Sequence, residues 1–313
     1  MIASLVGSSQ SMLDLRSYIP KVARSEANVL ITGDTGTGKE RVAESIHYES
    51  PRRNQPFVCV NCAAIPESLI ESELFGYERG AFTGAQQGYA GKLRLANGGT
   101  VFLDEIGDMS LPAQAKVLRA IENHEVFPLG GRQMAPINAR FIAAVNQDLE
   151  PLIAAQQFRR DLYYRLNVAR IFLPPLKERK EDIPELLSYY VHQFNDRFGE
   201  SVGEPSRELM ECLMRYDWPG NIRELRNLVE AIFIDPPRGS ISLGDLPESF
   251  RRIFAPYVSE AVPEKDRLLS TLYETNWNKS KAAAELRWSR MTLYRKLAKY
   301  KLTEPSTPPK MSS

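Results

Sequence analysis

The sequence predicts an α/β domain with a parallel sheet and a phosphate-binding loop, a helical subdomain, and a C-terminal all-α helix-turn-helix domain. Three observations lead to this fold class. Short apolar runs alternate with helical patterns over residues 28–173, a glycine-rich loop joins one run to a helix, and dense helical patterning with basic residues follows residue 263. Alternating β and α elements favour a parallel sheet with right-handed crossovers.

The expected strands are short and largely apolar, as strands covered by helices on both faces are. They are Asn28–Thr32, Phe57–Asn61, Thr100–Asp104, Arg140–Asn146 and Val168–Leu173, with helices such as Lys39–Tyr48 and Leu111–Asn123 between them. From Ile183 to Ile234 the apolar spacing is helical instead, which indicates a separate helical subdomain.

These patterns divide the chain into an α/β subdomain (4–173), a helical subdomain (174–235), a linker (236–263), a helix-turn-helix domain (264–302) and a disordered tail (303–313). The linker is inferred from the prolines and glycines of residues 235–263, although Leu246–Phe254 is compatible with a short helix. The tail, EPSTPPKMSS, has no core-forming residues.

Composition excludes several classes of protein. The chain has 313 residues, of which 43% are hydrophobic, and a formal net charge of +1, so the overall charge does not indicate a nucleic-acid partner. No apolar run approaches the roughly 20 residues of a membrane span, and Met1–Met12 lacks the features of a secretory signal. We therefore expect no membrane partner. The chain has only three cysteines, which indicates a reducing compartment, so we expect a cytoplasmic protein.

Cys59 and Cys62 form a C-x-x-C pair, which raises the question of a zinc or redox site. They lie in the apolar, β-prone stretch FVCVNCAA, where residues three apart face opposite sides of a strand. A structural zinc site normally needs four ligands, whereas the remaining cysteine, Cys212, is distant in sequence. We therefore interpret both cysteines as structural.

The strand NVLIT runs into a G-x-x-x-x-G-K motif formed by Gly33, Asp34, Thr35, Gly36, Thr37, Gly38, Lys39 and Glu40, and a helix follows. The glycines let backbone N–H groups cradle phosphate oxygens, and Lys39 adds a full charge on the β- and γ-phosphates of a nucleotide. The generic motif ends in a Ser or Thr that binds Mg²⁺. Here that position is Glu40, so we do not expect direct metal ligation from a hydroxyl.

A second motif, Val101–Glu105, ends in two carboxylates at the C-terminal edge of an apolar strand, where α/β sheets bind ligands. We expect Asp104 to hold Mg²⁺ through water and Glu105 to orient or deprotonate the attacking water. The alternative is a pair of solvated acids at a strand end. Both motifs occur in order within one predicted sheet, which favours the catalytic interpretation.

The segment Glu73–Ala85 contains the sequence GAFTGA at Gly80, Ala81, Phe82, Thr83, Gly84 and Ala85. With the two motifs above, it resembles the sigma-54-dependent activators (bacterial enhancer-binding proteins), which are AAA+ ATPases. The resemblance covers residues 4–235 and continues through Asn61–Ala64, Phe158–Asn167 and Trp218–Leu225. In this family GAFTGA lies at the tip of a loop that contacts sigma-54 and moves as ATP is hydrolysed. Without the resemblance, Phe82 would be expected to pack on a neighbouring core.

The resemblance implies further site residues and partners. By it, Arg159 and Arg165 reach the γ-phosphate of a neighbouring subunit, Arg223 contacts the nucleotide within its own subunit, and Asn146 senses it. Asn61 matches the residue that holds the catalytic glutamate until the nucleotide state changes. The alternatives are surface arginines paired with Asp161 or Glu178, and a strand-end hydrogen bond for Asn61. The implied cofactors are ATP and Mg²⁺, and the implied assembly is a hexameric ring of this chain or of related subunits.

The C-terminal segment 265–301 holds ten basic and three acidic residues, an excess of seven positive charges. Such a local excess is an electrostatic footprint for phosphate. Helices are expected at Asp266–Thr275 and Lys279–Leu286, and a third is expected from the cap Ser289 to Tyr300, in a pattern that resembles the Fis-type helix-turn-helix. The side chains expected to meet double-stranded upstream DNA are Ser289, Arg290, Met291, Thr292, Tyr294 and Arg295.

The sequence therefore predicts an activator that binds upstream DNA, hydrolyses ATP and remodels the sigma-54 RNA polymerase holoenzyme. Three rival classes remain: a repressor that has lost contact with sigma-54, a general AAA+ remodeller, and a non-enzymatic scaffold. The intact GAFTGA sequence argues against the repressor, and the basic C-terminal helices argue against the general remodeller. The scaffold conflicts with intact Lys39, Asp104 and Glu105. Because the sequence begins almost at the ATPase module, either a separate protein regulates it or it is a truncated piece.

Overall fold

The computed structural model describes residues 5–261, 268–269, 271–273, 275, 277–286, 288–300 and 302. The chain divides into two compact units. The first comprises Met1–Glu200 and Asp217–Ile234, and the second comprises Ser201–Tyr216 and Asp235–Ser313. The first unit carries the parallel sheet and the predicted nucleotide site.

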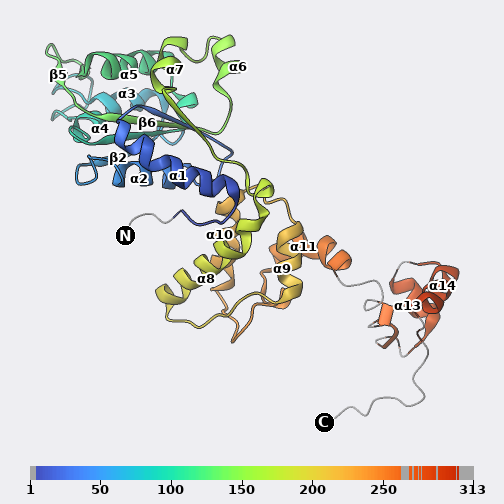
Figure 1. The fold of residues 1–313 in the computed structure, drawn as a ribbon. Coiled ribbons are helices and arrows are strands. Elements are labelled where there is room, and N and C mark those ends of the chain that lie inside the picture. Colours follow the sequence, from blue (N-terminus) through green and yellow to red (C-terminus); the bar gives the residue numbers. More distant parts are fainter. Residues whose placement is uncertain are drawn as a thin grey trace. The chain divides into compact units, whose positions relative to one another are not determined.

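Within the described part of the chain, the first unit contains one sheet of five parallel strands in the order β2-β3-β6-β1-β7. Figure 1 labels β2 and β6 of this sheet. The strands are β1 (Val29–Thr32), β2 (Phe57–Asn61), β3 (Thr100–Asp104), β6 (Arg140–Val145) and β7 (Ala169–Phe172). Each predicted strand is present, with ends that differ by at most one residue. The predicted α/β fold class with a parallel sheet is confirmed.

Helices cover both faces of the sheet, which explains why the central strands are apolar on both sides. Helices α1 (Gln10–Ser25) and α2 (Lys39–Tyr48) bury Ile19 and Val42 against one face. The other face is covered by α3 (Glu67–Phe75), α4 (Lys92–Leu95), α5 (Leu111–Asn123) and α7 (Arg160–Leu166). Shorter elements are η1 (Ile106–Asp108), α6 (Leu149–Ala154), and a hairpin of β4 (Glu125–Val126) and β5 (Ala135–Pro136).

The first unit continues beyond the sheet with η2 (Leu176–Glu178), η3 (Lys180–Asp182), α8 (Ile183–Phe198) and α10 (Asn221–Ile232). Helices α8 and α10 pack together, and the Phe194 ring lies 5.5 Å from that of Phe233 at the end of α10. The predicted helical region that follows the sheet is therefore present.

The second unit contains α9 (Arg207–Arg215), η4 (Leu243–Asp245) and α11 (Glu248–Ala261). Helix α11 packs on α9, where Phe254 is fully buried and meets Tyr216 edge-on at 5.3 Å. Ile241 is also buried and pairs with Pro205 through a bridge. The expected linker is therefore wrong for residues 241–261, because the apolar side chains between its prolines are buried in a folded region.

Two further helices of the second unit are α13 (Lys279–Glu285) and α14 (Arg290–Tyr300), which pack through a small core of their own. It includes Leu268, Leu272, Ala282, Ala283, Leu286, Leu293 and Leu297. The two predicted helices around the turn are confirmed. The first predicted helix, Asp266–Thr275, lies partly outside the described residues, and the predicted tail 303–313 lies wholly outside them. Among the described residues, no helix is both long and apolar enough to cross a membrane.

His47 gives the α/β unit a defined response to acid. The side chain is 1% exposed and its Nδ1 lies 2.9 Å from Thr100 Oγ1. Burial lowers the pKa of His47 below its usual 6.5, and the nearby charge of Arg140 lowers it further. The unfolded chain therefore binds a proton at higher pH than the folded chain does. Stability is fully present above pH 6.5 and falls as the pH drops below it.

We expect the free energy of unfolding, measured with urea, to fall between pH 7.5 and 5.5 by up to about 1.4 kcal/mol per pH unit from this group alone. His47→Gln should start less stable at pH 7.5 and show a shallower fall. The control is His192→Gln, because His192 is exposed, and it should keep the wild-type slope. Equal slopes in all three proteins would show that His47 does not carry the effect.

Candidate nucleotide site and partner loops

The sheet brings four predicted site segments to one edge. The phosphate-binding loop follows β1, Asp104 ends β3, Asn146 follows β6, and Asn61 ends β2. These strands are neighbours in the order β2-β3-β6-β1 and run parallel, so their carboxyl ends lie side by side. Asn61 is in register with Asp104, and Thr32 with Val145.

The phosphate-binding loop is held largely through its carbonyl groups. Each carbonyl from Gly33 to Gly38 accepts a hydrogen bond, at distances between 2.8 and 3.3 Å. In chain order the donors are Lys39 Nζ, Thr37 N, Asn221 Nδ2, Ile222 N, Arg179 Nη2 and Val42 N. Because a trans peptide points its C=O and the next N–H in opposite directions, anchoring the carbonyls turns most of the N–H groups toward the phosphate position.

Lys39 and Glu105 meet at the centre of the site. The Lys39 ammonium donates to Gly33 O at 2.8 Å and lies 3.3 Å from Glu105 Oε1. The other Glu105 oxygen accepts the Asn146 N–H at 2.9 Å. Glu105 has φ 51° and ψ 51°, a left-handed conformation that is uncommon for a residue with a side chain and often found at functional sites. Glu105 is therefore held by Lys39 of α2 and by the backbone that follows β6.

Asp104 is half-buried beside this pair. Burial raises the pKa of Asp104, while the charge of Lys39 opposes the rise. Glu40 is exposed and lines the same pocket. Carboxylate oxygens are what Mg²⁺ prefers, and Mg²⁺ usually takes one or two of them together with substrate phosphates. The described residues hold no cluster of three metal-binding side chains.

A pocket of about 330 Å³ extends from the phosphate-binding loop. Its polar end contains Thr35–Lys39, Asp104 and Glu105, and the remaining wall includes Arg223, Arg226 and Asn227 of α10. Residues that sequence reasoning missed complete the lining: Leu5, Val6, Met12, Arg41, Leu173, Arg179, Leu186, Tyr189, Tyr190, Gln193 and Ile222. A mixed pocket with one charged end fits a nucleoside triphosphate.

The start of α10 clamps the loop. Asn221, which is 2% exposed, accepts the Leu176 N–H at 2.7 Å and donates to Thr35 O at 2.9 Å. A Cβ on Gly36 would lie 2.4 Å from Gly220 O, and φ is +80° there, so only glycine fits. Residues 218–220 form a tight turn before this helix, closed by a bond from Asn221 N–H to Trp218 O. Arg223 lines the pocket and its backbone N–H reaches Gly36 O at 3.3 Å.

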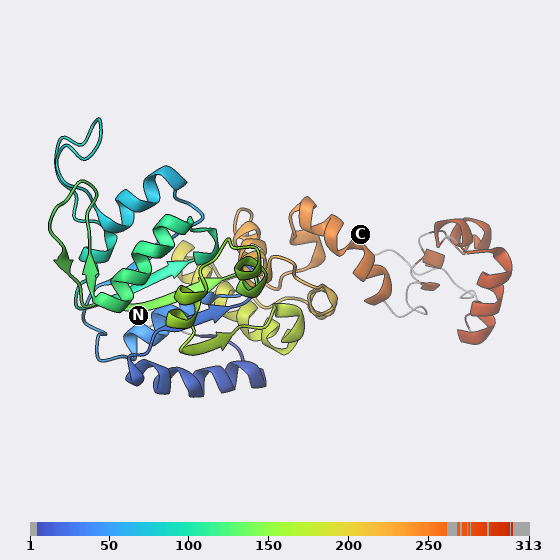
Figure 2. The ribbon, with the colours of Figure 1, turned by 90° about the horizontal axis from the view of Figure 1, so that it is seen from above.

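The GAFTGA segment lies on a long excursion between α3 and α4, seen beside the β4–β5 hairpin in Figure 2. Phe82 is 45% exposed. One edge of the contact is internal, because its ring meets that of Tyr77 edge-on at 4.9 Å, and the rest of the side chain faces solvent. Thr83 is exposed. Gly80 and Gly84 have positive φ and open space around the Cβ position, while Ala85 is buried.

The β4–β5 hairpin supports the base of this excursion. Tyr77 exchanges two hydrogen bonds with Tyr89, Glu78 N–H donates to Leu129 O at 3.0 Å, and Leu129 N–H donates to Gly76 O at 2.9 Å. A Cβ at Gly130 would lie 2.9 Å from the Ala81 Cβ. The loop between β4 and β5 is therefore joined to the GAFTGA excursion through its backbone.

The two predicted arginine fingers do not line the pocket of their own chain. Arg165 is 60% exposed and pairs with Glu122 of α5 at 2.7 Å. Arg159 is 40% exposed and pairs with Asp161 at 2.7 Å, the surface pairing left open as an alternative. Buried Gln114, missed by sequence reasoning, accepts the Arg159 N–H at 2.8 Å and donates to Met109 O and Gln157 O. The backbone of Arg159 is thus fixed.

Asn61 is exposed and its Oδ1 accepts the Ala64 N–H at 3.1 Å, the strand-end bond considered as its alternative. Asn146 Nδ2 lies 3.4 Å from Thr35 Oγ1, beside the phosphate-binding loop.

Cys62 is buried, and burial raises the pKa of its thiol to about 12, which disfavours the thiolate that redox chemistry needs.

Helix α14 presents the predicted DNA-reading side chains. Ser289 Oγ accepts the Thr292 N–H at 3.1 Å, so the expected cap is present. Leu293 and Leu297 are buried, whereas Met291 is 79% exposed and Tyr294 is 53% exposed with Lys279 Nζ 5.7 Å from its ring. Arg290 and Arg295 are also exposed. The charges counted at Lys265, Asp266, Arg267, Glu274, Arg287 and Lys301 lie outside the described residues.

Comparison with known proteins agrees with this geometry. Residues 5–172 match the model of the Sigma-54 interaction domain, 177–256 that of the AAA+ ATPase lid domain, and 262–300 that of the bacterial regulatory proteins of the Fis family. The chain is 46% identical over 301 residues to the transcriptional regulatory protein ZraR of Escherichia coli (strain K12), covering 94% of this chain and 68% of ZraR.

Two further relatives are informative. The chain is 50% identical over 245 residues to the sigma-54-dependent transcriptional activator SfnR of Pseudomonas putida, covering 78% of this chain and 66% of SfnR. The crystal structure of NtrX from Brucella abortus with ATP matches with a TM-score of 0.73 and 34% identity, covering 96% of this chain and 70% of NtrX. The chain therefore belongs to the sigma-54-dependent transcriptional activators, with an ATP-binding AAA+ domain and a Fis-type helix-turn-helix that binds DNA.

Proposed function

We propose that the chain binds DNA upstream of its promoters, assembles into a ring and uses ATP hydrolysis to remodel the sigma-54 RNA polymerase promoter complex into the open state. One observation carries the proposal: a complete phosphate-binding and acidic pocket stands in the same α/β unit as an exposed GAFTGA loop. The pocket binds and hydrolyses ATP, and the loop contacts the polymerase.

The chemistry follows from the pocket. Lys39 places a positive charge where the β- and γ-phosphates lie, and the N–H groups of Thr35, Gly36, Gly38 and Lys39 bind their oxygens. Asp104 would hold Mg²⁺ through water, and the bound ion would neutralise phosphate charge. Glu105 orients the attacking water and takes its proton. Arg223 and Asn146, at the pocket wall and the sheet edge, respond to the γ-phosphate.

The ring is proposed from the position of the arginines. Arg159 and Arg165 are exposed and do not line their own pocket, as expected of groups that serve the nucleotide of a neighbour. A head-to-tail interface that closes on itself gives a ring, and we propose a hexamer. Arg165 must then leave its ion pair with Glu122 and bind the γ-phosphate instead. Asn61 must likewise leave its strand-end hydrogen bond and bind Glu105.

DNA recognition is assigned to the N-terminal half of α14. Arg290, Met291, Tyr294 and Arg295 are exposed on this helix, whereas Leu293 and Leu297 are buried, and Ser289 and Thr292 lie at the cap. In a helix-turn-helix these positions meet base edges in the major groove.

The experiment is transcription from a sigma-54 promoter with purified holoenzyme, with and without the upstream DNA site. We expect open complexes to form with ATP and not with a non-hydrolysable analogue. The repressor class predicts DNA binding without open complexes, a general remodeller predicts ATPase activity that ignores this polymerase, and a scaffold predicts no hydrolysis.

A further inference from the structure

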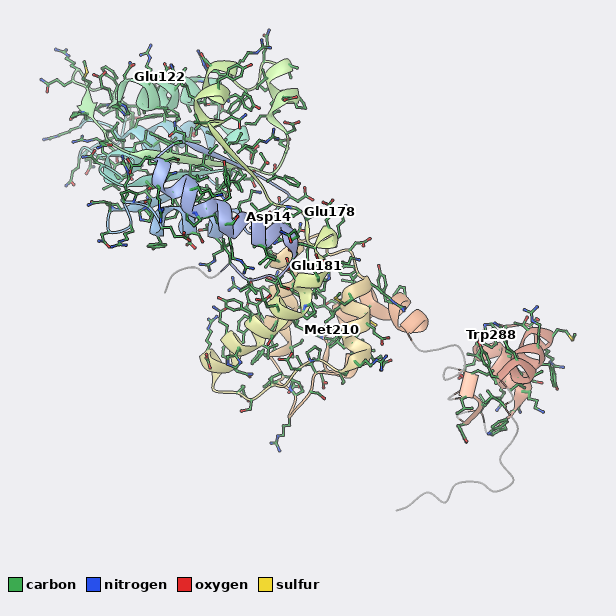
Figure 3. All side chains as sticks on the ribbon, in the orientation of Figure 1. Asp14, Glu122, Glu178, Glu181, Met210 and Trp288 are labelled. Atoms are coloured by element: carbon green, nitrogen blue, oxygen red, sulfur yellow. The ribbon has the colours of Figure 1, made fainter. Side chains whose placement is uncertain are left out.

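Arg179 and Asp182 form a buried ion pair next to the phosphate-binding loop. Arg179 is 1% exposed, Asp182 is fully buried, and their nearest charged atoms are 3.9 Å apart. They lie where η2 and η3 meet, in the region marked in Figure 3 by the labels Glu178 and Glu181, with Asp14 of α1 nearby. A buried pair at this separation needs further hydrogen bonds to offset its desolvation. Arg179 makes such bonds to the phosphate-binding loop, and Asp182 makes them to the segment before α1.

Arg179 reaches the phosphate-binding loop. Its Nη2 donates to Thr37 O at 3.0 Å, and its Nη1 lies 2.9 Å from the Met12 sulfur. Nε has no hydrogen-bond partner among the described residues. Because sulfur is a weak acceptor, Thr37 O is the principal neutral partner of the guanidinium. Holding this carbonyl toward Arg179 turns the N–H of Gly38 the opposite way, as a phosphate-binding peptide requires.

Asp182 reaches the segment that precedes α1. Its carboxylate accepts the Ser9 N–H at 2.6 Å and the Ser9 hydroxyl at 2.8 Å. A Cβ on Gly7 would lie 2.7 Å from the Asp182 carboxyl carbon, so the backbone passes directly over the carboxylate. Arg16 fixes the same segment by donating to Leu5 O at 3.0 Å and Gly7 O at 2.6 Å. Leu5 and Val6 then line the nucleotide pocket.

We propose that Arg179 is a positioning residue for the phosphate-binding loop, and that Asp182 makes ATP affinity depend on the docking of residues 7–9. The chain of contacts runs from Ser9 through Asp182 and Arg179 to Thr37. A change in the path of the N-terminal segment therefore alters the position of the phosphate-binding loop, although the segment at residues 7–9 makes no contact with the phosphates. This inference rests on the nucleotide site described above.

The proposal has a reciprocal consequence. If docking of residues 7–9 strengthens ATP binding, ATP binding must strengthen docking by the same factor. The Ser9 amide, which donates to Asp182, is a local reporter of docking. Its hydrogen exchange should slow when ATP is added to the wild-type chain, and the slowing should be much smaller in Arg179→Lys.

The test measures the ATP dissociation constant of four variants by calorimetry on the full chain. Arg179→Lys keeps the charge for Asp182 but loses the planar group that also holds Thr37 O, and should weaken binding about 10-fold or more. Ser9→Ala removes the hydroxyl that donates to Asp182 and also lies 3.1 Å from Ser11 Oγ, and should weaken ATP binding about 3- to 10-fold. In the double variant the Ser9→Ala effect should largely vanish. Ser17→Ala is the control, since its exposed hydroxyl bonds only within α1.

A merely structural role gives a different pattern. Partly unfolded protein lowers kcat with an unchanged KM, whereas a displaced phosphate-binding loop raises KM among folded molecules. Wild-type affinity in Ser9→Ala, or fully additive effects in the double variant, would overturn the connection to the N-terminal segment. Wild-type KM in folded Arg179→Lys would overturn the positioning role. Failure of the wild-type chain itself to bind ATP would contradict the proposed function instead.

Discussion

Glu105→Gln is expected to reduce ATP hydrolysis by at least about 100-fold while ATP binding is retained, because general-base catalysis contributes about 10²–10⁴-fold. Glutamine has the same shape and can still accept the Asn146 N–H that holds Glu105. It cannot take a proton from water, and it removes the charge that lies 3.3 Å from Lys39. The lost charge near the phosphates is expected to leave ATP affinity unchanged or raise it.

Phosphate release and calorimetric ATP binding, measured on one preparation, separate the two roles. Asp108→Asn is the matched control, because this exposed acid lies on η1 just after Glu105 and should keep wild-type turnover. Lys39→Ala should instead lose ATP binding. Wild-type turnover in Glu105→Gln would mean that the wrong carboxylate has been assigned.

Arg165→Ala is expected to reduce hydrolysis about 10³-fold or more, as for other arginine fingers supplied in trans, while each chain still binds ATP. The reason is geometric, since the 60% exposed guanidinium does not line the pocket of its own chain. Hydrolysis by the wild-type protein should also rise steeply with protein concentration, because the site is completed only on assembly.

Mixing Arg165→Ala with Lys39→Ala provides the decisive comparison. The first supplies a nucleotide site and the second supplies a finger, so activity should return in mixed assemblies. Arg160→Ala is the control, since this exposed arginine lies on the same helix and should retain activity alone. If mixtures shown to co-assemble recover no activity, Arg165 does not act in trans.

The elements of the α/β unit could be predicted closely from the sequence because their signals are local. An apolar run such as Thr100–Asp104 identifies a buried strand, and the glycine pattern before Lys39 identifies the loop. Parallel pairing then brings the ends of β1, β2, β3 and β6 together without further information.

The contacts that complete the site could not be predicted, because they join residues distant in sequence through single side chains. Asn221 bonds to Thr35, Gln114 fixes Arg159, and Arg179 holds Thr37. Polar residues of these kinds are usually exposed, so composition gives no signal for their burial. The linker prediction failed for a related reason: prolines dominated the local pattern, whereas Ile241 and Phe254 are buried in tertiary contacts.

The central claim is that the GAFTGA loop transmits ATP hydrolysis to the polymerase. Thr83 is exposed on the excursion between α3 and α4 and does not line the nucleotide pocket. Thr83→Ala removes one hydroxyl and should leave the pocket and α14 unchanged. ATP can shift this loop only through contacts that differ between nucleotide states. If the loop cannot bind sigma-54, the protein hydrolyses ATP but the promoter complex does not open.

The most direct measurement is phosphate release together with open-complex formation on a sigma-54 promoter, for wild-type, Thr83→Ala and Gln87→Ala. Gln87 is the control, since it is exposed on the same excursion outside the motif. We predict near-normal hydrolysis in all three proteins and loss of open complexes in Thr83→Ala alone. Wild-type open-complex formation by both Thr83→Ala and Phe82→Ala would contradict the assignment of this loop as the contact with sigma-54.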